Sequence, residues 1–332
     1  MIRLAINGFG RIGRSVFKVA FDNPEIDVVA INDLIDAKTL GHLLHYDSVY
    51  GPYKYLVGSS DTYISVNNKT IKVYNQKDPK LLPWGDDKID VVIESTGKFT
   101  TAQGAGEHLN AGAKKVILSA PSKEGEMMTL VIGVNSDKYK GEKSVSNASC
   151  TTNCIAPVVD IVNKSLGIKK ATMSTVHAYT SDQRLHDTAH EDLRRARAAA
   201  VNVIPTTTGA AIAATEALPE LKNKFDGMAI RVPVINGSLS DIVMLVGKNT
   251  TKEEVNKILT DAANEPRFKN IVRVTQDPIV STDIIGDPYS SIIDLSLTKV
   301  VDGDLVKVVA WYDNEWGYSN RMVDTALLIS QK

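Results

Sequence analysis

The stretch IRLAINGFGRIGR, residues 2–14, decides the fold of this chain. Its apolar first half predicts a buried strand, and the helical periodicity of Arg11–Phe21 predicts a helix directly behind it. Between them stands the pattern G-x-G-x-x-G, formed by Gly8, Gly10 and Gly13. Glycines permit the tight turn and let the backbone approach a pyrophosphate, which rests on the N-terminus of the helix. A strand, a glycine turn and a helix in this order predict a dinucleotide-binding unit.

The next apolar run supports this interpretation. Ile26–Ile31 predicts a second strand, and it leads into Asn32 and Asp33, twenty residues past Gly13. A carboxylate at this position can accept hydrogen bonds from the adenosine ribose, and it would repel a 2′-phosphate. Asp33 therefore predicts NAD rather than NADP as the cofactor.

Two further strand ends are candidate cofactor contacts. Ser95-Thr96-Gly97 and Ser119-Ala120-Pro121 each follow a compact apolar run. Strand C-termini face the ligand crevice in an open α/β sheet, so Thr96 and Ser119 are candidates. An ordinary turn between strand and loop is the alternative interpretation of either motif.

The two halves of the chain have different patterns, and its 332 residues predict two domains. The first half alternates apolar runs with helical patterns, which is typical of an α/β parallel sheet. Its predicted strands are residues 2–7, 26–31, 90–94, 115–119 and 129–134, with a hairpin over 63–66 and 70–74.

The second half predicts an antiparallel sheet with helices on one face. Its strand candidates are residues 172–179, 228–234, 238–246, 292–300 and 306–312. Thr251 followed by Glu254 predicts a capped helix that runs to about residue 264. A last helix is expected over residues 319–330.

The segment Ser149-Cys150-Thr151-Thr152-Asn153-Cys154 carries the strongest chemical signal. It lies where a strand-like run meets a helix-like stretch, so helix N–H groups favour negative charge there. This position, or a nearby imidazole, is expected to lower the pKa of Cys150 and make its thiolate a nucleophile. A buried, inert cysteine is the alternative, and the flanking hydroxyl groups argue against it. Cys154 is interpreted as structural, and no metal site is expected because no second Cys or His pair lies at ligand spacing. Pro157 lies inside the predicted helix and would kink it.

Other residues are candidates for a base and for anion binding. His177 ends a strand-like run and could act on Cys150 as base and then acid, although a core histidine is the alternative. Residues 192–197 form a short basic cluster, in which Arg194 and Arg197 are interpreted as a solvated face, and a hydroxyl-rich helix start at residues 206–211 could hold an anion. Arg231 lies inside an apolar strand, where a charge needs a partner or a ligand. Together these features predict a substrate that carries phosphate.

Composition narrows the function classes. The chain has 38 basic and 39 acidic residues, so nothing in its net charge indicates a nucleic-acid partner. No apolar stretch approaches the ~18 residues needed to span a bilayer. Two cysteines make no disulfide framework, so a reducing, cytoplasmic setting is expected.

Five motifs together give the chain a family resemblance. In order, they are INGFGRIGR (6–14), SNASCTTNC (146–154), DLRRAR (192–197), PTTTGAA (205–211) and WYDNE (311–315). Over essentially its whole length the chain resembles the phosphorylating glyceraldehyde-3-phosphate dehydrogenases. The resemblance implies an α/β fold: a doubly wound parallel NAD-binding domain, residues 1–149 and 315–332, and an α+β catalytic domain, residues 150–314, with a mainly antiparallel sheet.

The resemblance also implies roles for individual residues. Cys150 would be the nucleophile and His177 its base, while Thr180 and Arg231 would hold the substrate's own phosphate. The attacking inorganic phosphate would contact Ser149, Thr151, Thr208 and Gly209, with Arg195 nearby. The residues expected to bind NAD are Gly8, Gly10, Arg11, Ile12, Gly13, Asp33, Lys77, Thr96, Ser119, Asn314 and Tyr318.

The implied reaction converts D-glyceraldehyde 3-phosphate to 1,3-bisphosphoglycerate, through a hemithioacetal and a thioester on Cys150. The family is typically a homotetramer, in which a loop from about residue 180 to 202 reaches a neighbouring subunit. Thr188-Ala189 stands where NAD-preferring members commonly carry Leu-Pro. We therefore expect NAD preference with weak use of NADP.

Three alternatives remain open at this point. Erythrose-4-phosphate dehydrogenase uses water as acceptor, and the retained phosphate set argues against it. Aspartate-semialdehyde dehydrogenase shares only the architecture, and Asp33 argues against it. A binding protein that uses this fold without catalysis would not need Cys150 and His177, which are both present.

Overall fold

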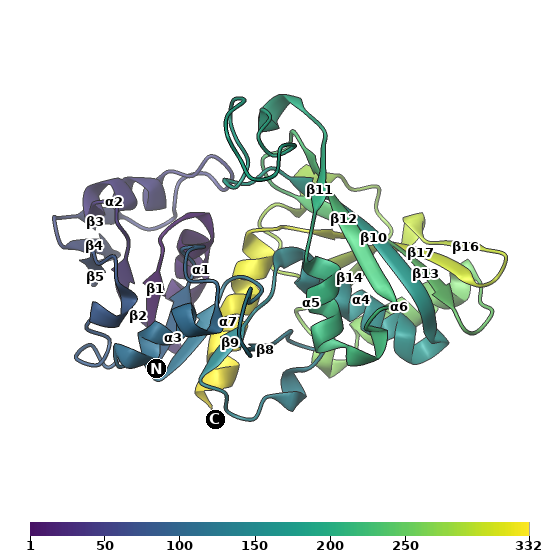
Figure 1. Ribbon diagram of the computed structural model, residues 1–332, viewed down its shortest axis with the longest axis horizontal. Helices are drawn as coiled ribbons and strands as arrows, with labels where there is room; N and C mark the ends of the chain where they lie inside the picture. The colour runs from purple at the N-terminus through teal and green to yellow at the C-terminus, as the bar shows by residue number, and fades with distance from the viewer. Residues whose placement is uncertain (332) are drawn as a thin grey trace. The chain divides into compact units, whose positions relative to one another are not determined.

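The computed structural model describes residues 1–331, and the chain divides into two units (Figure 1). The first unit comprises Met1–Leu130, Lys138–Ala148 and the chain from Ser319 onward, and the second comprises Val131–Asp137 and Ser149–Tyr318. These units differ from the predicted domain boundaries at residues 131–137, at Ser149 and at residues 315–318. The predicted boundaries stay a prediction.

The first unit contains a sheet that, among the described residues, has nine strands and is parallel except at one edge. In spatial order the strands are β3 (Val57–Ser59), β4 (Tyr63–Val66), β5 (Lys69–Tyr74), β2 (Ile26–Asn32), β1 (Ile2–Asn7), β6 (Val91–Glu94), β7 (Lys115–Leu118), β9 (Ser144–Ser146) and β8 (Met128–Thr129). The strand order reverses at β1, which pairs with β2 on one side and β6 on the other. In such sheets ligands bind outside the carboxyl ends of the strands at the reversal.

Helices α1 (Arg11–Phe21), α2 (Ala37–His45) and α3 (Ala102–Asn110) and the 3₁₀ turn η1 (Pro79–Leu81) lie between strands of this unit. Helix α7 (Trp316–Ser330) belongs to it from Ser319 onward, and the 3₁₀ turn η2 (Ser136–Lys138) belongs to it only at Lys138. The predicted strand 2–7 and helix 11–21 are confirmed with their bounds. The predicted hairpin is also confirmed, and Asn67 and Asn68 make its turn with φ angles of 48° and 65°.

The second unit contains an eight-stranded sheet within the described chain. Its path is β11 (Ile204–Thr207), β12 (Phe225–Val232), β10 (Ile168–Ala178), β13 (Ser238–Val246), β17 (Leu305–Tyr312), β15 (Ser291–Asp294) and β14 (Val272–Thr275), and β16 (Lys299–Val301) pairs with β17. Two pairs, β10 with β12 and β14 with β15, are parallel, and the rest are antiparallel. The predicted fold class is confirmed for both sheets.

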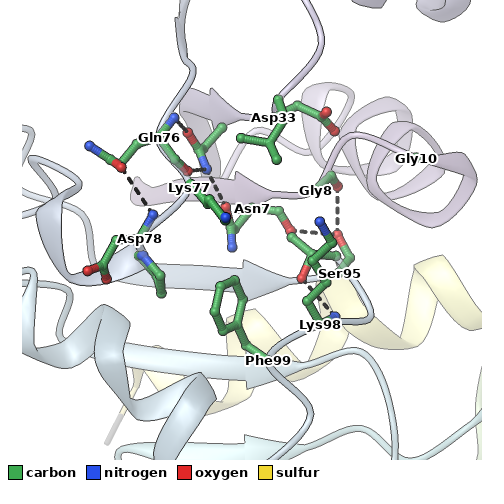
Figure 2. A pocket seen from close by; sticks show the side chains of 14 residues that line it. Asn7, Gly8, Gly10, Asp33, Gln76, Lys77, Asp78, Ser95, Lys98 and Phe99 are labelled. Carbon is green, nitrogen blue, oxygen red and sulfur yellow. Dashed lines mark hydrogen bonds between the residues drawn. The ribbon is translucent and has the colours of Figure 1, made fainter.

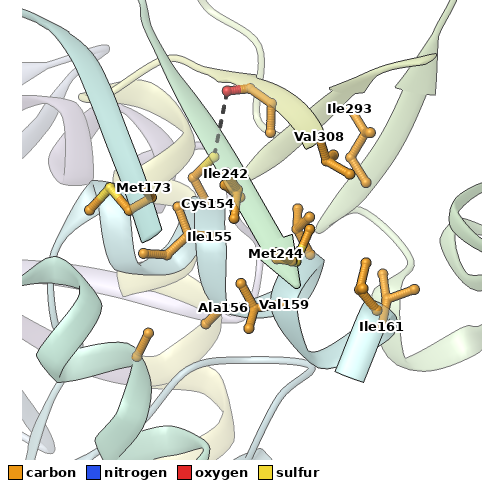
Figure 3. Packing of buried hydrophobic residues seen from close by; sticks show 14 of the residues in the cluster. Cys154, Ile155, Ala156, Val159, Ile161, Met173, Ile242, Met244, Ile293 and Val308 are labelled. Carbon is orange, nitrogen blue, oxygen red and sulfur yellow. Dashed lines mark hydrogen bonds between the residues drawn. The ribbon is translucent and has the colours of Figure 1, made fainter. Parts of the chain in front are cut away.

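Three helices belong to this sheet, and their apolar side chains make the core. They are α4 (Cys150–Leu166), α5 (Ala210–Ala217) and α6 (Lys252–Ala263), with short turns η3 (Ala199–Val201), η4 (Pro219–Leu221), η5 (Pro266–Phe268), η6 (Ser281–Ile284) and η7 (Leu295–Leu297). Figure 3 shows Ile155 and Val159 of α4 among Met173, Ile242 and Met244 of the sheet. Residues Thr151 to Val162 are all buried, and this burial fixes the helix whose first residue is Cys150.

Some sequence predictions about these elements are wrong. Residues 129–134 do not form one strand, because β8 ends at Thr129 and Val131 and Val134 are buried instead in the core of the second unit. Residues 292–300 are broken by η7, where the Asp294 carboxylate accepts from the Ser296 N–H and turns the chain. Pro157 lies inside α4, which continues to Leu166, and the kink expected there stays a prediction.

The capped helix begins as predicted, but only half of its capping box forms. Thr251 Oγ1 accepts from the Glu254 N–H at 3.2 Å. The Glu254 carboxylate instead accepts from Thr250 Oγ1 at 2.9 Å. Among the described residues, no helix combines the length and apolarity needed to cross a bilayer, and no cluster of three His, Cys, Asp or Glu side chains could hold a metal ion.

Candidate active site

A cavity of about 660 Å³ lies in the first unit at the carboxyl ends of its central strands. Figure 2 shows side chains from β1, from the loop after β2 and from the loop after β6 around it. It is lined by Asn7, Gly8, Gly10, Asn32, Asp33, Leu34, Gln76, Lys77, Asp78, Pro79, Ser95, Thr96, Lys98 and Phe99. The location is where an open α/β sheet binds its ligand.

The glycines at this cavity are required by close backbone contacts. A Cβ at Gly13 would lie 2.1 Å from the Gly8 carbonyl oxygen, and Gly8 itself adopts φ +93° with Thr96 N within 2.6 Å of a Cβ. Gly10 differs, because a Cβ there would meet no atom within 4 Å. Gly10 is also the N-cap of α1 and supplies no side-chain cap. The start of α1 therefore presents N–H groups beside open space, which suits a pyrophosphate.

Asp33 both lines the cavity and holds the glycine loop. One carboxylate oxygen accepts from the Phe9 N–H at 2.7 Å, and the other accepts from the Ile35 N–H at 3.1 Å. A carboxylate oxygen can accept more than one hydrogen bond. Asp33 can thus keep the glycine loop in place and still accept from a ribose hydroxyl group.

The structure brings some predicted cofactor residues together and leaves others apart. Gly8, Gly10, Asp33, Lys77 and Thr96 line the cavity. Four predicted cofactor residues of this unit lie outside the lining, namely Arg11, Ile12, Gly13 and Ser119. Arg11 pairs with Asp47 at 3.0 Å, and the Ser119 N–H donates to the Glu94 carbonyl at 2.9 Å.

Ser95, from the candidate motif Ser95-Thr96-Gly97, also lines the cavity, and the lining residues that were missed are Asn7, Asn32, Leu34, Gln76, Asp78, Pro79, Lys98 and Phe99. Asn7 and Asn32 are the last residues of two adjacent parallel strands, so the strand-end rule could have found them.

The second unit pairs the predicted nucleophile with the predicted base. Cys150 Sγ lies 3.5 Å from His177 Nε2. Cys150 is the first residue of α4, and His177 is the next-to-last residue of β10. The helix and the strand pack in one core, which brings together side chains that are 27 residues apart.

His177 Nδ1 lies between an acceptor and a donor. The Ala178 carbonyl oxygen is 2.6 Å away, and Arg231 Nη1, which can only donate, is 2.8 Å away and also donates to that carbonyl at 3.2 Å. The other ring nitrogen, Nε2, faces Cys150 Sγ, and it can act as a base in the tautomer that carries its hydrogen on Nδ1.

Burial controls the charges of this pair. It raises the pKa of the Cys150 thiol, against an opposing effect of the Arg231 cation and of hydrogen bonds at the helix start. Burial also lowers the pKa of His177 to about 3, and Arg231 lowers it further in the same direction. The expected lowering of the Cys150 pKa is therefore wrong for the free protein, because loss of solvation outweighs the helix terminus. A neutral thiol faces a neutral imidazole.

The start of α4 is tied to the start of α5. Ser149 Oγ accepts from the Thr152 N–H at 3.0 Å as the N-cap of α4. Thr152 Oγ1 lies 2.8 Å from Ser149 Oγ and donates to the Ala210 carbonyl at 3.2 Å. Gly209 is the N-cap of α5, and the Thr208 hydroxyl accepts from the Ala210 N–H at 3.2 Å. Ser149, Thr208 and Gly209 thus surround two adjacent helix N-termini, which is favourable for an anion.

Thr151 is turned into the protein. The Thr175 hydroxyl donates to the Leu239 carbonyl at 3.0 Å, so it must accept from Tyr312 at 2.8 Å. Burial raises the pKa of Tyr312, which keeps its proton and donates it. The Thr151 hydroxyl, 2.9 Å from the Tyr312 oxygen, then has to donate to it. Tyr312 was missed as a site residue, although it lies inside the motif WYDNE.

The remaining predicted residues are held in different ways. Arg231 is partly buried beside His177, whereas the Thr180 N–H donates to the Gln183 side chain at 3.4 Å. Arg195 is engaged with Asp182 at 2.6 Å and with Thr206 and Thr207, so it braces the loop. Asn314 Oδ1 accepts from the Gly237 N–H and the Ser238 hydroxyl, and Tyr318 is buried near the start of α7.

Comparison with known proteins agrees with this geometry. Residues 2–102 match the family described as glyceraldehyde 3-phosphate dehydrogenase, NAD binding domain, and residues 149–314 match its C-terminal domain. The chain is 53% identical to glyceraldehyde-3-phosphate dehydrogenase of Geobacillus stearothermophilus over 333 residues, which cover 100% of this chain and 99% of that protein. It is 54% identical to the enzyme of that name from Borreliella burgdorferi, with 98% of each chain covered. It is 52% identical to glyceraldehyde-3-phosphate dehydrogenase 1 of Bacillus subtilis, covering 100% and 99%.

Proposed function

This chain belongs to the glyceraldehyde-3-phosphate dehydrogenase family, and we propose that it is the phosphorylating, NAD-dependent enzyme. Its reaction oxidises D-glyceraldehyde 3-phosphate with NAD and inorganic phosphate to 1,3-bisphosphoglycerate, as in glycolysis and gluconeogenesis. The observation that carries the proposal is the 3.5 Å contact between Cys150 Sγ and Nε2 of His177.

Covalent catalysis begins at Cys150. As its sulfur bonds to the aldehyde carbon, its proton passes to His177 Nε2 and then to the new alkoxide, which gives a hemithioacetal. Burial makes the free thiolate costly, so proton transfer and C–S bond formation are expected to be coupled. This coupling avoids a free thiolate before the substrate is bound.

Oxidation uses the same imidazole. NAD, when bound, supplies the acceptor for the hydride of the hemithioacetal carbon. His177 Nε2 takes the hydroxyl proton as the carbonyl forms, and the product is a thioester on Cys150. This step needs the tautomer with hydrogen on Nδ1, which the Ala178 carbonyl oxygen, 2.6 Å from Nδ1, can accept from.

Phosphate then attacks the thioester carbon. The C–S bond breaks, the sulfur recovers its proton from His177, and the acyl phosphate leaves. We propose that Ser149, Thr208 and Gly209 hold the attacking phosphate at the adjoining starts of α4 and α5. Thr151 directs its hydrogen at Tyr312, so its oxygen would accept from the hydroxyl group of a protonated phosphate. Thr180 and Arg231 are proposed for the substrate's own phosphate, since Arg231 is a partly buried cation next to His177.

The cofactor is NAD, and we propose that the cavity around the glycine loop holds its adenosine and pyrophosphate. Asn314 and Tyr318 remain proposed contacts of the nicotinamide. We also propose weak use of NADP, because Thr188 and Ala189 are small while Asp33 opposes a 2′-phosphate. Comparing kcat/KM for the two cofactors tests this, and a higher value with NADP would overturn it.

We propose that the enzyme is a homotetramer in the cytoplasm. The loop from 180 to 202 exposes large apolar side chains, with Leu185 at 78%, Leu193 at 81% and Val201 at 76%. Such exposure is typical of surfaces that a second subunit covers. Light scattering after size-exclusion chromatography should give four chains per particle, and a monomer would overturn the assembly.

The function itself is tested by following NADH with and without inorganic phosphate. Wild-type protein should give sustained turnover of D-glyceraldehyde 3-phosphate only when phosphate is present, and Cys150→Ser should give none. Turnover indifferent to phosphate, or stronger with erythrose 4-phosphate, would replace the proposal with the hydrolytic relative. No activity with either sugar would favour the non-catalytic alternative.

A further inference from the structure

A buried polar cluster adjoins the cofactor cavity, and the reaction chemistry does not use it. Its members are Glu94, the last residue of β6, His108 of α3, and Trp84. The side chains of Glu94 and His108 are 0% exposed, and so is Trp84. A buried carboxylate must have its charge satisfied by hydrogen bonds or by a cation. The position of the hydrogen on His108 therefore decides whether the Glu94 carboxylate is satisfied by hydrogen bonds.

Trp84 decides where the proton of His108 lies. The indole Nε1 donates to His108 Nδ1 at 3.0 Å, and an indole N–H can only donate. His108 Nδ1 is therefore an acceptor, and the ring hydrogen is on Nε2. Nε2 donates to Glu94 Oε2 at 2.9 Å. Asn7 Nδ2 lies 3.3 Å from His108 Nε2, but two donors do not bond to each other. Asn7 Nδ2 donates to the Glu94 carboxylate.

Four donors then converge on the Glu94 carboxylate. Oε2 accepts from His108 Nε2 and from Asn7 Nδ2, the latter at 2.5 Å. Oε1 accepts from the N–H of Thr96 at 2.8 Å and from its hydroxyl. His108 is neutral in this arrangement, so no cation is involved. Four hydrogen bonds can stabilise a buried carboxylate as an anion.

These bonds continue into the wall of the cavity. Asn7 Oδ1 accepts from Asn32 Nδ2 at 2.6 Å. Asn32 then bonds both backbone groups of Gln76, at 2.9 Å and 2.8 Å. Figure 2 shows Asn7 and Gln76 joined through this chain of hydrogen bonds beside the cavity. Asn7, Asn32, Gln76 and Thr96 all line it.

We propose that Glu94 and His108 are positioning residues for NAD. They touch no cofactor themselves, and they orient Thr96 directly and Asn32 and Gln76 through the side-chain amide of Asn7. The side-chain amides of Asn7 and Asn32 and the backbone of Gln76 are thereby oriented before the cofactor binds. This orientation lowers the entropic cost of ordering the site on binding. The inference rests on the NAD site proposed above and is independent of the chemistry at Cys150.

The substitution Glu94→Gln changes one oxygen into an NH₂ group and leaves the volume nearly unchanged. Either orientation of the new amide sets a donor against donors, toward Thr96 or toward His108 and Asn7. His108 cannot relieve the conflict by moving its hydrogen to Nδ1, because Trp84 donates there. An unsatisfied buried group of this kind is expected to raise the Kd for NAD by about tenfold or more.

The experiment is calorimetric titration of NAD into full-length wild type, Glu94→Gln and Asp160→Asn. Asp160 is a matched control, since its carboxylate is 1% exposed and accepts from Arg267 at 2.6 Å and Lys164 at 2.9 Å in the other unit. Glu94→Gln should raise the Kd and KM for NAD about tenfold, with kcat at saturating NAD within about twofold of wild type. Alkylation of Cys150 without NAD should be unchanged. Asp160→Asn should lose stability and keep its NAD affinity.

Equal NAD affinity in Glu94→Gln and wild type would overturn the proposal, and so would an equal loss in Asp160→Asn. If Glu94→Gln does not fold, ¹⁵N spectra of histidine-labelled wild type decide the matter, with His108→Gln for assignment. The His108 signals should show hydrogen on Nε2 alone, and hydrogen on Nδ1 would contradict the network. NAD binding without phosphate-dependent turnover would defeat the proposed function and leave this inference standing.

Discussion

At the scale of single residues, the reactivity of Cys150 is a balance between burial and one cation. Burial raises the pKa of the thiol, and Arg231 works against it. Arg231 also lies 2.8 Å from His177 Nδ1 and helps to lower the pKa of that imidazole. The same guanidinium therefore favours negative charge on the sulfur, and it keeps the imidazole neutral before attack, when His177 has still to accept the thiol proton.

Replacing Arg231 should make Cys150 less reactive at a given pH. In Arg231→Met the pKa of Cys150 should rise further, so the pH profile of its alkylation by iodoacetamide moves to higher pH. Mass spectrometry of the Cys150 peptide measures the rate. Cys154 should stay unmodified, because burial raises its pKa to about 12.

Arg267→Met is the matched control for this experiment, since Arg267 pairs with Asp160 rather than with the reacting groups. An unchanged profile in Arg231→Met, or a move to lower pH, would contradict the electrostatic role given to Arg231.

At the scale of elements, the turn between β1 and α1 separates two uses of glycine. A Cβ at Gly13 would meet the Gly8 carbonyl at 2.1 Å, whereas a Cβ at Gly10 would meet nothing within 4 Å. Gly13→Ala should therefore cost stability, on the order of 1–3 kcal/mol as overpacking does. Gly10→Ala should fold normally and bind NAD more weakly, because the methyl group points into open space beside the cavity.

Thermal unfolding and NAD titration of the two variants test this contrast. A stable Gly13→Ala protein with normal NAD affinity would show that the turn can relax. Normal affinity in Gly10→Ala would show that the pyrophosphate does not approach this residue.

Elements whose signal is local could be predicted from the sequence. The strand 2–7 and helix 11–21 were predicted with correct bounds because apolar spacing and glycines lie within the segment itself. The prediction of one strand over residues 129–134 was wrong because Val131 and Val134 are apolar for a different reason. They are buried in the core of the second unit, outside any strand. Pro157 does not end α4, because the residues on both sides of it are buried in the core of the second unit.

The residues of the candidate site likewise differ in whether a local sequence pattern could reveal them. Cys150 and the glycine loop could be found from short motifs, and the roles given to the predicted site residues stay predictions. The contact of Cys150 with His177 depends on how α4 packs on β10, which no local pattern encodes. The raised pKa of Cys150 and the buried hydrogen bond between His108 and Glu94 likewise depend on the tertiary structure.

At the scale of the whole molecule, stability in acid should depend on Asp47. Burial alone would raise the pKa of its carboxyl, but the Val49 N–H and the Arg11 and Lys18 cations lower it to about 2. A carboxyl whose pKa is lowered on folding stabilises the protein above its unfolded pKa of about 3.9, and this contribution is lost as the pH falls toward the folded value.

Asp47→Asn should therefore destabilise the protein near neutral pH by about 2 kcal/mol, and by much less at about pH 2. Urea unfolding of wild type and variant at both pH values measures the difference. Asp61→Asn is the control, because the Asp61 side chain is 90% exposed and its pair with Lys38 contributes little. A difference that does not shrink in acid would remove Asp47 from this role.

The central claim is that oxidation proceeds through a thioester on Cys150. The most direct test mixes the enzyme with NAD and D-glyceraldehyde 3-phosphate in the absence of inorganic phosphate, measures the NADH burst, and then analyses the quenched protein by mass spectrometry. The account predicts one NADH per subunit, a stop, and a 3-phosphoglyceroyl group on the Cys150 peptide, which phosphate then removes. Continued turnover without phosphate, or a burst with Cys150 unmodified, would contradict it.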